Sequence, residues 1–159
     1  MDRIVRGMLV LGVIAAVAGL TPGAALGQAG YGDYAQPSPT AGGSIDLRAE
    51  LRTAATHATN AVNSDAMSAV RSHLLHVVNC LEGPRGRNYV QAELNPCQGQ
   101  GNGILVDLRA AQGGAAWAPV AEGANDLAMK GSKMTDLAAA KAMARGAAAL
   151  LGAAAESLR

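Results

Sequence analysis

Apolar side chains recur at steps of three and four residues in two stretches that a short polar segment separates. The first stretch carries Leu47, Leu51, Ala54, Ala58 and Ala61, and the second carries Met67, Val70, Leu74, Val77 and Leu81. Such spacing places each set on one face of an α-helix. The two predicted helices form a hairpin over residues 44–83, because a turn as short as 63–65 forces neighbouring helices to run antiparallel.

The ends of this hairpin also follow from the sequence. Ser44 is the expected N-cap of the first helix, since its hydroxyl can accept a hydrogen bond from a free backbone N–H. Gly83 and Pro84 end the second helix, because glycine adopts the left-handed cap and proline cannot continue a helix.

A second pair of helical patterns occupies residues 115–159. A helix from about 116 to 130 has Trp117, Val120, Ala124 and Leu127 in register, and one from about 135 to 158 has Leu137, Ala140, Ala144, Ala147, Leu151, Ala154 and Leu158. The segment "GSKM" joins them into a second antiparallel hairpin. Residues 84–114 form the loop between the hairpins, with one helical turn expected at 90–94 and a short helix at 104–111. The predicted fold is all-α and resembles a four-helix bundle.

The N-terminal segment differs from the rest of the chain. Arg3 and Arg6 precede an apolar run, and small residues at Ala25 and Gly27 follow it, which is the layout of a secretory signal peptide over residues 1–27. An uncleaved membrane anchor is the alternative, because the apolar run approaches the length of a spanning helix. Residues 28–43 are rich in Gly, Pro and Ser and are predicted to be a disordered linker to the helical domain at 44–159. We therefore expect a periplasmic or secreted protein, with membrane contact only if the signal segment is retained.

Composition narrows the possible functions. Without residues 1–27, the chain has 11 basic and 11 acidic side chains, and no run of basic residues. A balanced charge of this kind argues against nucleic acid as a partner. The chain also lacks Phe and is rich in Ala and Gly, so we expect a core of small side chains.

Cys80 and Cys97 are the only two cysteines. In an exported protein such a pair is expected to form a disulfide, and closing so short a loop contributes about 3 kcal/mol in the chain-entropy model. The alternative makes Cys80 a thiolate metal ligand beside His76, which a disulfide would prevent.

The segment "HLLHVVNC" at 73–80 contains two of the three histidines in the chain. His73 and His76 lie one position before the apolar seam of their helix, and His57 lies at the flank of the preceding helix. In an antiparallel hairpin all three can converge on one side. Three histidines on two rigid helices are a candidate site for Cu, Zn or Ni, with a water or Met67 as a further ligand. The alternatives are structural histidines that bind nothing and histidines that sense pH.

Motifs of several enzyme and cofactor classes are missing. No Glu precedes a histidine by three residues as di-iron bundles require, no Cys-x-x-Cys-His binds haem covalently, and no His-Glu-x-x-His indicates a zinc protease. No haem is expected, since few aromatic residues remain to line a pocket. Nothing places Glu82 and Glu93 as an acid/base pair. The sequence favours a protein that is not an enzyme and has no catalytic residue.

The stretch "HLLHVVNCLEGPRGRNY" followed by "NPCQGQGNG" resembles small exported bacterial proteins of uncharacterised function, over residues 57–106. The resemblance implies a histidine-bearing helical hairpin followed by a cysteine-closed loop, and it brings no known activity. Its consequence is that His57, His73, His76, Cys80 and Cys97 are treated as one unit. The expected function is metal binding through the three histidines; the alternative is a structural or protein-interaction bundle of the cell envelope that binds an unknown protein partner and no metal.

Overall fold

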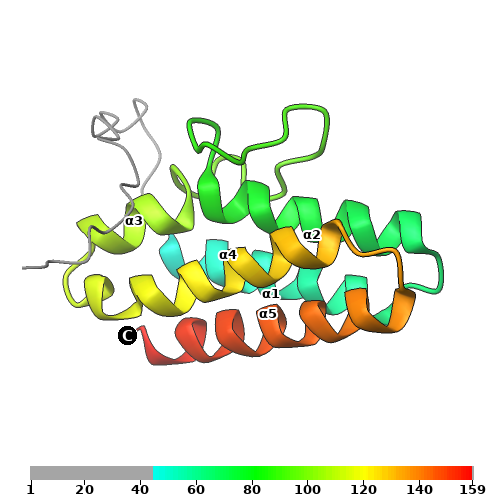
Figure 1. Ribbon diagram of the computed structural model, residues 1–159. Coiled ribbons are helices and arrows are strands. Elements are labelled where there is room, and N and C mark those ends of the chain that lie inside the picture. The colour runs from blue at the N-terminus through cyan, green and yellow to red at the C-terminus, as the bar shows by residue number, and fades with distance from the viewer. Residues whose placement is uncertain (1–44, 159) are drawn as a thin grey trace, which may run out of the picture. The chain divides into compact units, whose positions relative to one another are not determined.

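The computed structural model describes residues 45–158, and this part of the chain is helical (Figure 1). Its elements in chain order are α1 (Leu47–Asn63), α2 (Met67–Glu82), α3 (Ile104–Ala110), the 3₁₀-helix η1 (Gly114–Trp117), α4 (Ala118–Ser132) and α5 (Leu137–Ser157). The predicted signal peptide, the predicted linker and Ser44 lie outside the described residues.

Four of these helices form an antiparallel bundle. α1 packs against α2 and α5, and α4 packs against the same two helices, so that each is in contact with two neighbours. The α1–α2 and α4–α5 turns lie at the same end of the bundle, and α3 and η1 lie at the other end (Figure 1). The prediction of an all-α, bundle-like fold from two hairpins is confirmed.

The helix ends show which of the expected caps the chain uses. Asp46, rather than Ser44, is the N-cap of α1, and its carboxylate accepts a hydrogen bond from the N–H of Ala49. Asp136 caps α5 in the same way, so α5 begins two residues later than predicted. Gly83 ends α2 with a positive φ of 66°, as its position before Pro84 predicts.

Further boundaries also differ from the prediction. Residues 114–117 form a 3₁₀ turn ahead of α4, α4 extends to Ser132, and residues 90–94 form turns with no helix. The turn between α4 and α5 is therefore 133–136, later than the predicted "GSKM" segment. Side-chain capping by Asp136 and the helical continuation through Gly131 explain the shift, and neither is visible in the apolar period.

The core is built mainly from alanine and leucine. The predicted seams of α1, α2 and α5 are buried except at their terminal residues. In α4 the predicted register was right at Ala124, which is buried, and wrong at Trp117, Val120 and Leu127, which are only partly buried. Ala121 and Ala128 complete the buried face instead. The reason is close helix packing. A Cβ added to Gly131 would lie 2.8 Å from a methyl group of Leu74 and 2.9 Å from Cβ of Met143, so small residues form the seam and larger ones cover its edges.

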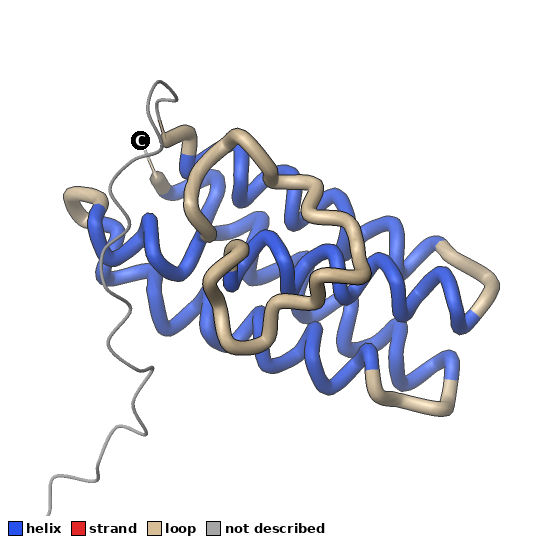
Figure 2. The backbone as a smooth tube through the Cα atoms, turned by 90° about the horizontal axis from the view of Figure 1, so that it is seen from above, coloured by secondary structure: helices blue, strands red, loops and turns tan. Residues whose placement is uncertain are grey.

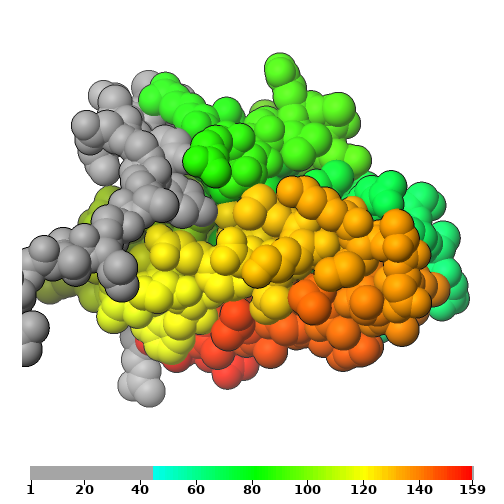
Figure 3. Space-filling view, in the orientation of Figure 1, coloured from blue at the N-terminus to red at the C-terminus, as the bar shows by residue number. Residues whose placement is uncertain are grey.

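The loop between α2 and α3 lies over the α2 side of the bundle. In Figure 2 it crosses above the helices, and in Figure 3 its residues (green) project beyond the surface that α4 and α5 form. A disulfide between Cys80 and Cys97 closes it, with Cα atoms 5.2 Å apart. Both cysteines are buried. The disulfide prediction is confirmed, and the alternative of Cys80 as a thiolate metal ligand is wrong, because its sulfur is bonded to Cys97.

Two buried carboxyl groups meet beneath the end of this loop. Glu50 of α1 and Asp107 of α3 are 1% and 2% exposed, and both lie within 2.7 Å of a Cβ built on Gly101. Asp107 accepts hydrogen bonds from the backbone N–H and the side-chain amide of Asn102. The polar neighbours of the Glu50 carboxyl group are the carboxyl group of Asp107 and the backbone of Gly103. Burial, followed by the charge of Asp107, raises the pKa of Glu50 to about 9, so Glu50 is protonated at neutral pH.

Among the described helices, only α5 is long and apolar enough to cross a membrane by length and composition. Core helices of bundles meet the same criterion. In this structure α5 packs along α1 and α4, and its residues Ala140, Ala144, Ala147 and Leu151 are fully buried by those neighbours. Its place in the core explains this buried stripe, while 28% of its apolar window is buried in all.

The first prediction concerns the disulfide. The double variant Cys80→Ala/Cys97→Ala is expected to lose about 3 kcal/mol of unfolding free energy, because the unfolded chain regains the freedom of the closed loop. Urea denaturation followed by circular dichroism measures this loss. Dithiothreitol should lower the stability of the parent protein by a similar amount and leave the variant unchanged. Equal stability of the two proteins would contradict the prediction.

The second prediction concerns Glu50. Its folded-state pKa is about 9 against an ordinary value of 4.5, so its contribution to stability is complete below pH 4.5 and is lost as the pH rises towards 9. Glu50→Gln keeps the shape and removes the ionisation, and should gain stability over the parent protein as the pH rises from 5 to 9, by at most about 1.4 kcal/mol per pH unit. Denaturant unfolding at five pH values measures the gain. The exposed Glu156→Gln should show none, and a pH-independent difference for Glu50→Gln would refute the assignment.

Candidate metal centre

The three histidines share one position relative to the core. His57 immediately precedes the buried Ala58 in α1, and His73 and His76 immediately precede the buried Leu74 and Val77 in α2. A residue one step before the seam of a helix lies at the flank of its buried face. Because α1 and α2 are antiparallel partners, the two flanks meet, and all three side chains are partly buried between them.

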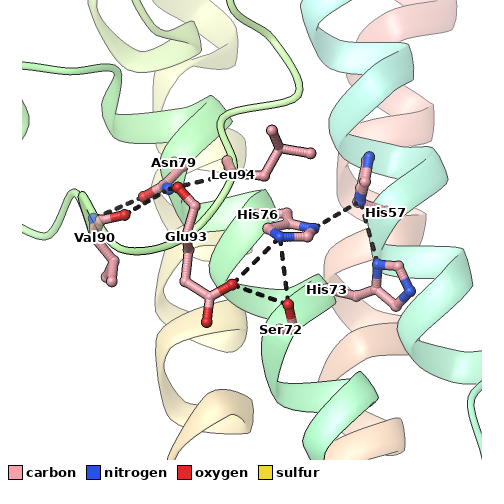
Figure 4. Close-up of polar contacts among 8 residues, drawn as sticks. All are labelled: His57, Ser72, His73, His76, Asn79, Val90, Glu93 and Leu94. Atoms are coloured by element: carbon pink, nitrogen blue, oxygen red, sulfur yellow. Dashed lines mark hydrogen bonds and ion pairs between the residues drawn. The ribbon is translucent and has the colours of Figure 1, made fainter.

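The rings converge through the same nitrogen atom. His57 Nδ1 lies 3.3 Å from His73 Nδ1 and 3.3 Å from His76 Nδ1 (Figure 4). The ring centroids are 5.1 to 5.7 Å apart, and His76 stands nearly perpendicular to the other two rings. One ligand atom from each histidine lies within 4.8 Å of the others. The predicted convergence of His57, His73 and His76 is therefore present in the structure.

Hydrogen bonds cannot account for both Nδ1 contacts of His57 at the same time. A neutral imidazole carries one N–H and one lone pair, on different nitrogen atoms. If His57 Nδ1 carries the proton, its N–H can donate to the lone pair of one neighbouring Nδ1. The other neighbour then finds no lone pair on His57 Nδ1 to which it could donate. If it carries the lone pair, two N–H groups compete for it. A metal ion bound by all three Nδ1 lone pairs removes the conflict.

The local environment favours the neutral form of two of these rings, because it lowers their pKa. Burial lowers the pKa of His57, and the charges of His76 and His73 lower it further. Burial also lowers the pKa of His76, against the opposing effect of Glu93. Neutral rings offer the lone pairs that a metal needs without first losing protons.

The nitrogen separations match those around a small metal ion. With Zn–N bonds of about 2.0 to 2.1 Å, two ligands at the tetrahedral angle are about 3.3 to 3.4 Å apart. Both Nδ1 separations from His57 have this value. At the same bond length, neighbouring ligands at a right angle would be only about 2.9 Å apart. The two pairs that include His57 thus have the spacing of neighbouring tetrahedral ligands, and the three ligand atoms as a set lie within 4.8 Å of one another.

Glu93 is a residue of this site that the sequence did not assign. Its Oε2 lies 3.4 Å from Nε2 of His76, and it accepts a hydrogen bond of 2.9 Å from the hydroxyl of Ser72. Glu82, by contrast, is buried and accepts hydrogen bonds from Asn88 and Asn125. The two carboxylates have different partners and do not form a pair. No local signal identifies Glu93, since it comes from an aperiodic loop.

Asn79 holds that loop in place. It lies on α2 one turn after His76, and its amide donates to the carbonyl oxygens of Val90, Glu93 and Leu94 at 3.0 to 3.2 Å. Its own carbonyl accepts from the N–H of Val90 at 2.8 Å. Asn79 is fully buried, so this one side chain fixes the segment that carries Glu93 (Figure 4).

Met67 does not complete the predicted ligand set. It begins α2 and packs partly against the core. It lies six positions before His73, which is about 9 Å along the helix axis, and the helical period places the two side chains on different faces of α2. Helical geometry therefore favours water over Met67 as the further ligand predicted for the site.

Comparison with protein-family models, with curated proteins and with solved structures returned no match. The resemblance to small exported bacterial proteins stays a prediction. Functional inference for this chain rests on the geometry of the site itself.

The third prediction concerns Asn79. Asn79→Ala should lower the unfolding free energy by about 2 kcal/mol or more, because the buried N–H of Val90 and the loop carbonyls lose their partner. Urea unfolding measures the loss. Asn63→Ala, at the exposed end of α1, is the matched control and should cost much less. Equal effects of the two substitutions would show that Asn79 does not fix the loop.

Proposed function

We propose that this protein is an exported metal-binding protein that holds one transition-metal ion through Nδ1 of His57, His73 and His76. The observation that carries the proposal is the pair of 3.3 Å contacts between Nδ1 of His57 and Nδ1 of the other two histidines. Three imidazole rings turned towards one point, with lone pairs that hydrogen bonds do not all satisfy, form a ready set of metal ligands.

Zinc(II) and copper(I) fit the site best among copper, zinc and nickel. Both accept imidazole ligands, and both adopt tetrahedral or trigonal arrangements, whose ligand separations are close to the two Nδ1 separations from His57. Square-planar nickel(II) and copper(II) require right angles between neighbouring ligands. The protein would have to rearrange the three rings to bind them.

A location outside the cytoplasm, which we expect from two features, would suit a role in metal handling. A disulfide indicates an oxidising environment, and the N-terminal pattern of residues 1–27 is that of a signal peptide. Three protein ligands leave one coordination position for an exchangeable donor. We infer storage or delivery of the metal rather than catalysis, because Glu93, the one carboxylate in contact with the histidines among the described residues, is already engaged with His76 and Ser72.

The alternative is a structural or protein-interaction bundle that binds no metal. In that case the histidine contacts are ordinary packing between α1 and α2. The two proposals differ in one measurable property: only the metal-binding protein is stabilised by metal ions.

The fourth prediction tests this property. Residues 28–159, freed of metal by a chelator, should be stabilised by zinc(II), and by copper(I) under oxygen-free conditions with a reductant that leaves the disulfide intact. A metal at a hundred times its dissociation constant adds about 2.7 kcal/mol, or roughly 10 °C in melting temperature. His57→Ala, His73→Ala and His76→Ala should each abolish most of this shift.

Two substitutions outside the site serve as controls. Thr59→Ala in α1 and Ser68→Ala in α2 replace exposed residues of the same helices and should retain the full shift. A parent protein that gains no stability from any of the metals would refute metal binding and favour the interaction bundle. A shift that survives in all three histidine variants would place the metal elsewhere.

A further inference from the structure

We propose that Glu93 is the positioning residue of the metal site: it holds His76 in the orientation and tautomer that present Nδ1 to the metal. This inference rests on the proposed metal-binding function and adds a second segment of the chain to the site, the disulfide-closed loop.

The two ring nitrogens of His76 have different surroundings. Nδ1 faces His57 Nδ1 at 3.3 Å, whereas Nε2 faces Glu93 Oε2 and the Ser72 hydroxyl, each at 3.4 Å (Figure 4). An ionised carboxylate can only accept a hydrogen bond. The proton of a neutral His76 is therefore held on Nε2, and the lone pair remains on Nδ1, where the other histidines converge.

The carboxylate is itself fixed. The Ser72 hydroxyl donates to the same Oε2 that faces His76, and Ser72 lies one helical turn before His76 on α2. The backbone carbonyl of Glu93 accepts from the buried amide of Asn79, one turn after His76. Residues on both sides of His76 along α2 thus hold Glu93 against the ring.

Only one of the three histidines is oriented in this way. Among the described residues, the Nε2 atoms of His57 and His73 have no carboxylate or hydroxyl partner, and the carboxylate lies only at His76. A carboxylate that accepts from the distal nitrogen of a metal-bound histidine fixes its tautomer and raises its basicity, and loss of such a partner typically weakens metal binding about 10- to 100-fold. We expect Glu93 to act on the metal through His76 alone.

The test combines ring-nitrogen NMR with metal affinity. In metal-free protein at pH 8, ¹⁵N shifts of His76 should show the tautomer with the proton on Nε2. Glu93→Ala should produce a mixture of tautomers and weaken zinc binding about 10- to 100-fold in chelator competition. Glu93→Gln retains an acceptor oxygen, so it should keep the tautomer and lose less than about 10-fold in affinity.

Gln91→Ala, at an exposed position of the same loop, is the matched control and should leave both the tautomer and the affinity unchanged. Unfolding curves of the metal-free variants separate an effect on the site from an effect on the fold, and Glu93→Gln remains informative if Glu93→Ala unfolds.

The outcomes distinguish the two proposals. Zinc binding by the parent protein with unchanged tautomer and affinity in Glu93→Ala would overturn the role of Glu93 and leave the proposed function intact. A parent protein that binds neither zinc(II) nor copper(I) would overturn both. An equal loss in Glu93→Gln and Glu93→Ala, with the tautomer preserved in both, would assign the effect to the charge of Glu93 and overturn its positioning role.

Discussion

The close packing of α1 against α2 is the constraint on which the site depends. The seam of α1 consists largely of alanine at Ala54, Ala58 and Ala61, all fully buried. Small side chains let the two helix backbones approach, and helix flanks meet only when the backbones are close. The histidines occupy those flanks, one residue before buried positions of each seam. A wider hairpin would separate His57 from His73 and His76 and leave three unrelated surface side chains.

The loop between α2 and α3 adds a carboxylate, that of Glu93, to the histidines of the hairpin. A hairpin of two helices can bring ligands together, but among the described residues of this hairpin only Ser72 contacts a distal ring nitrogen, Nε2 of His76, and no carboxylate of the hairpin does. The disulfide between Cys80 and Cys97 closes the loop, and Asn79 binds three of its carbonyl groups. These constraints bring Glu93 back to His76 from 17 residues further along the chain. The hairpin supplies the ligands, and the loop orients one of them.

The end of the same loop contacts the bundle at two buried carboxyl groups. Beneath Gly101, Glu50 of α1 and Asp107 of α3 lie in contact with the loop, and burial favours the protonated form of Glu50. The carboxylate of Asp107 accepts two hydrogen bonds from Asn102. A core with no Phe and many alanines has few large apolar contacts to hold a long loop. In this protein the disulfide, the buried amide of Asn79 and the buried carboxyl groups of Glu50 and Asp107 hold the loop on the bundle.

The sequence by itself determined the helices, their pairing into hairpins and the disulfide, and it placed the three histidines where they could converge. All of these depend on local periodicity, on short turns or on the identity of two cysteines. Tertiary structure alone decided the buried face of α4, the use of Asp46 as the α1 cap, the actual convergence and Nδ1 geometry of the histidines, and the places of Glu93 and Glu50. Helical period fixes which residues share a face, but the rotation of each helix and the path of an aperiodic loop result from contacts between residues far apart in the chain, which no local pattern records.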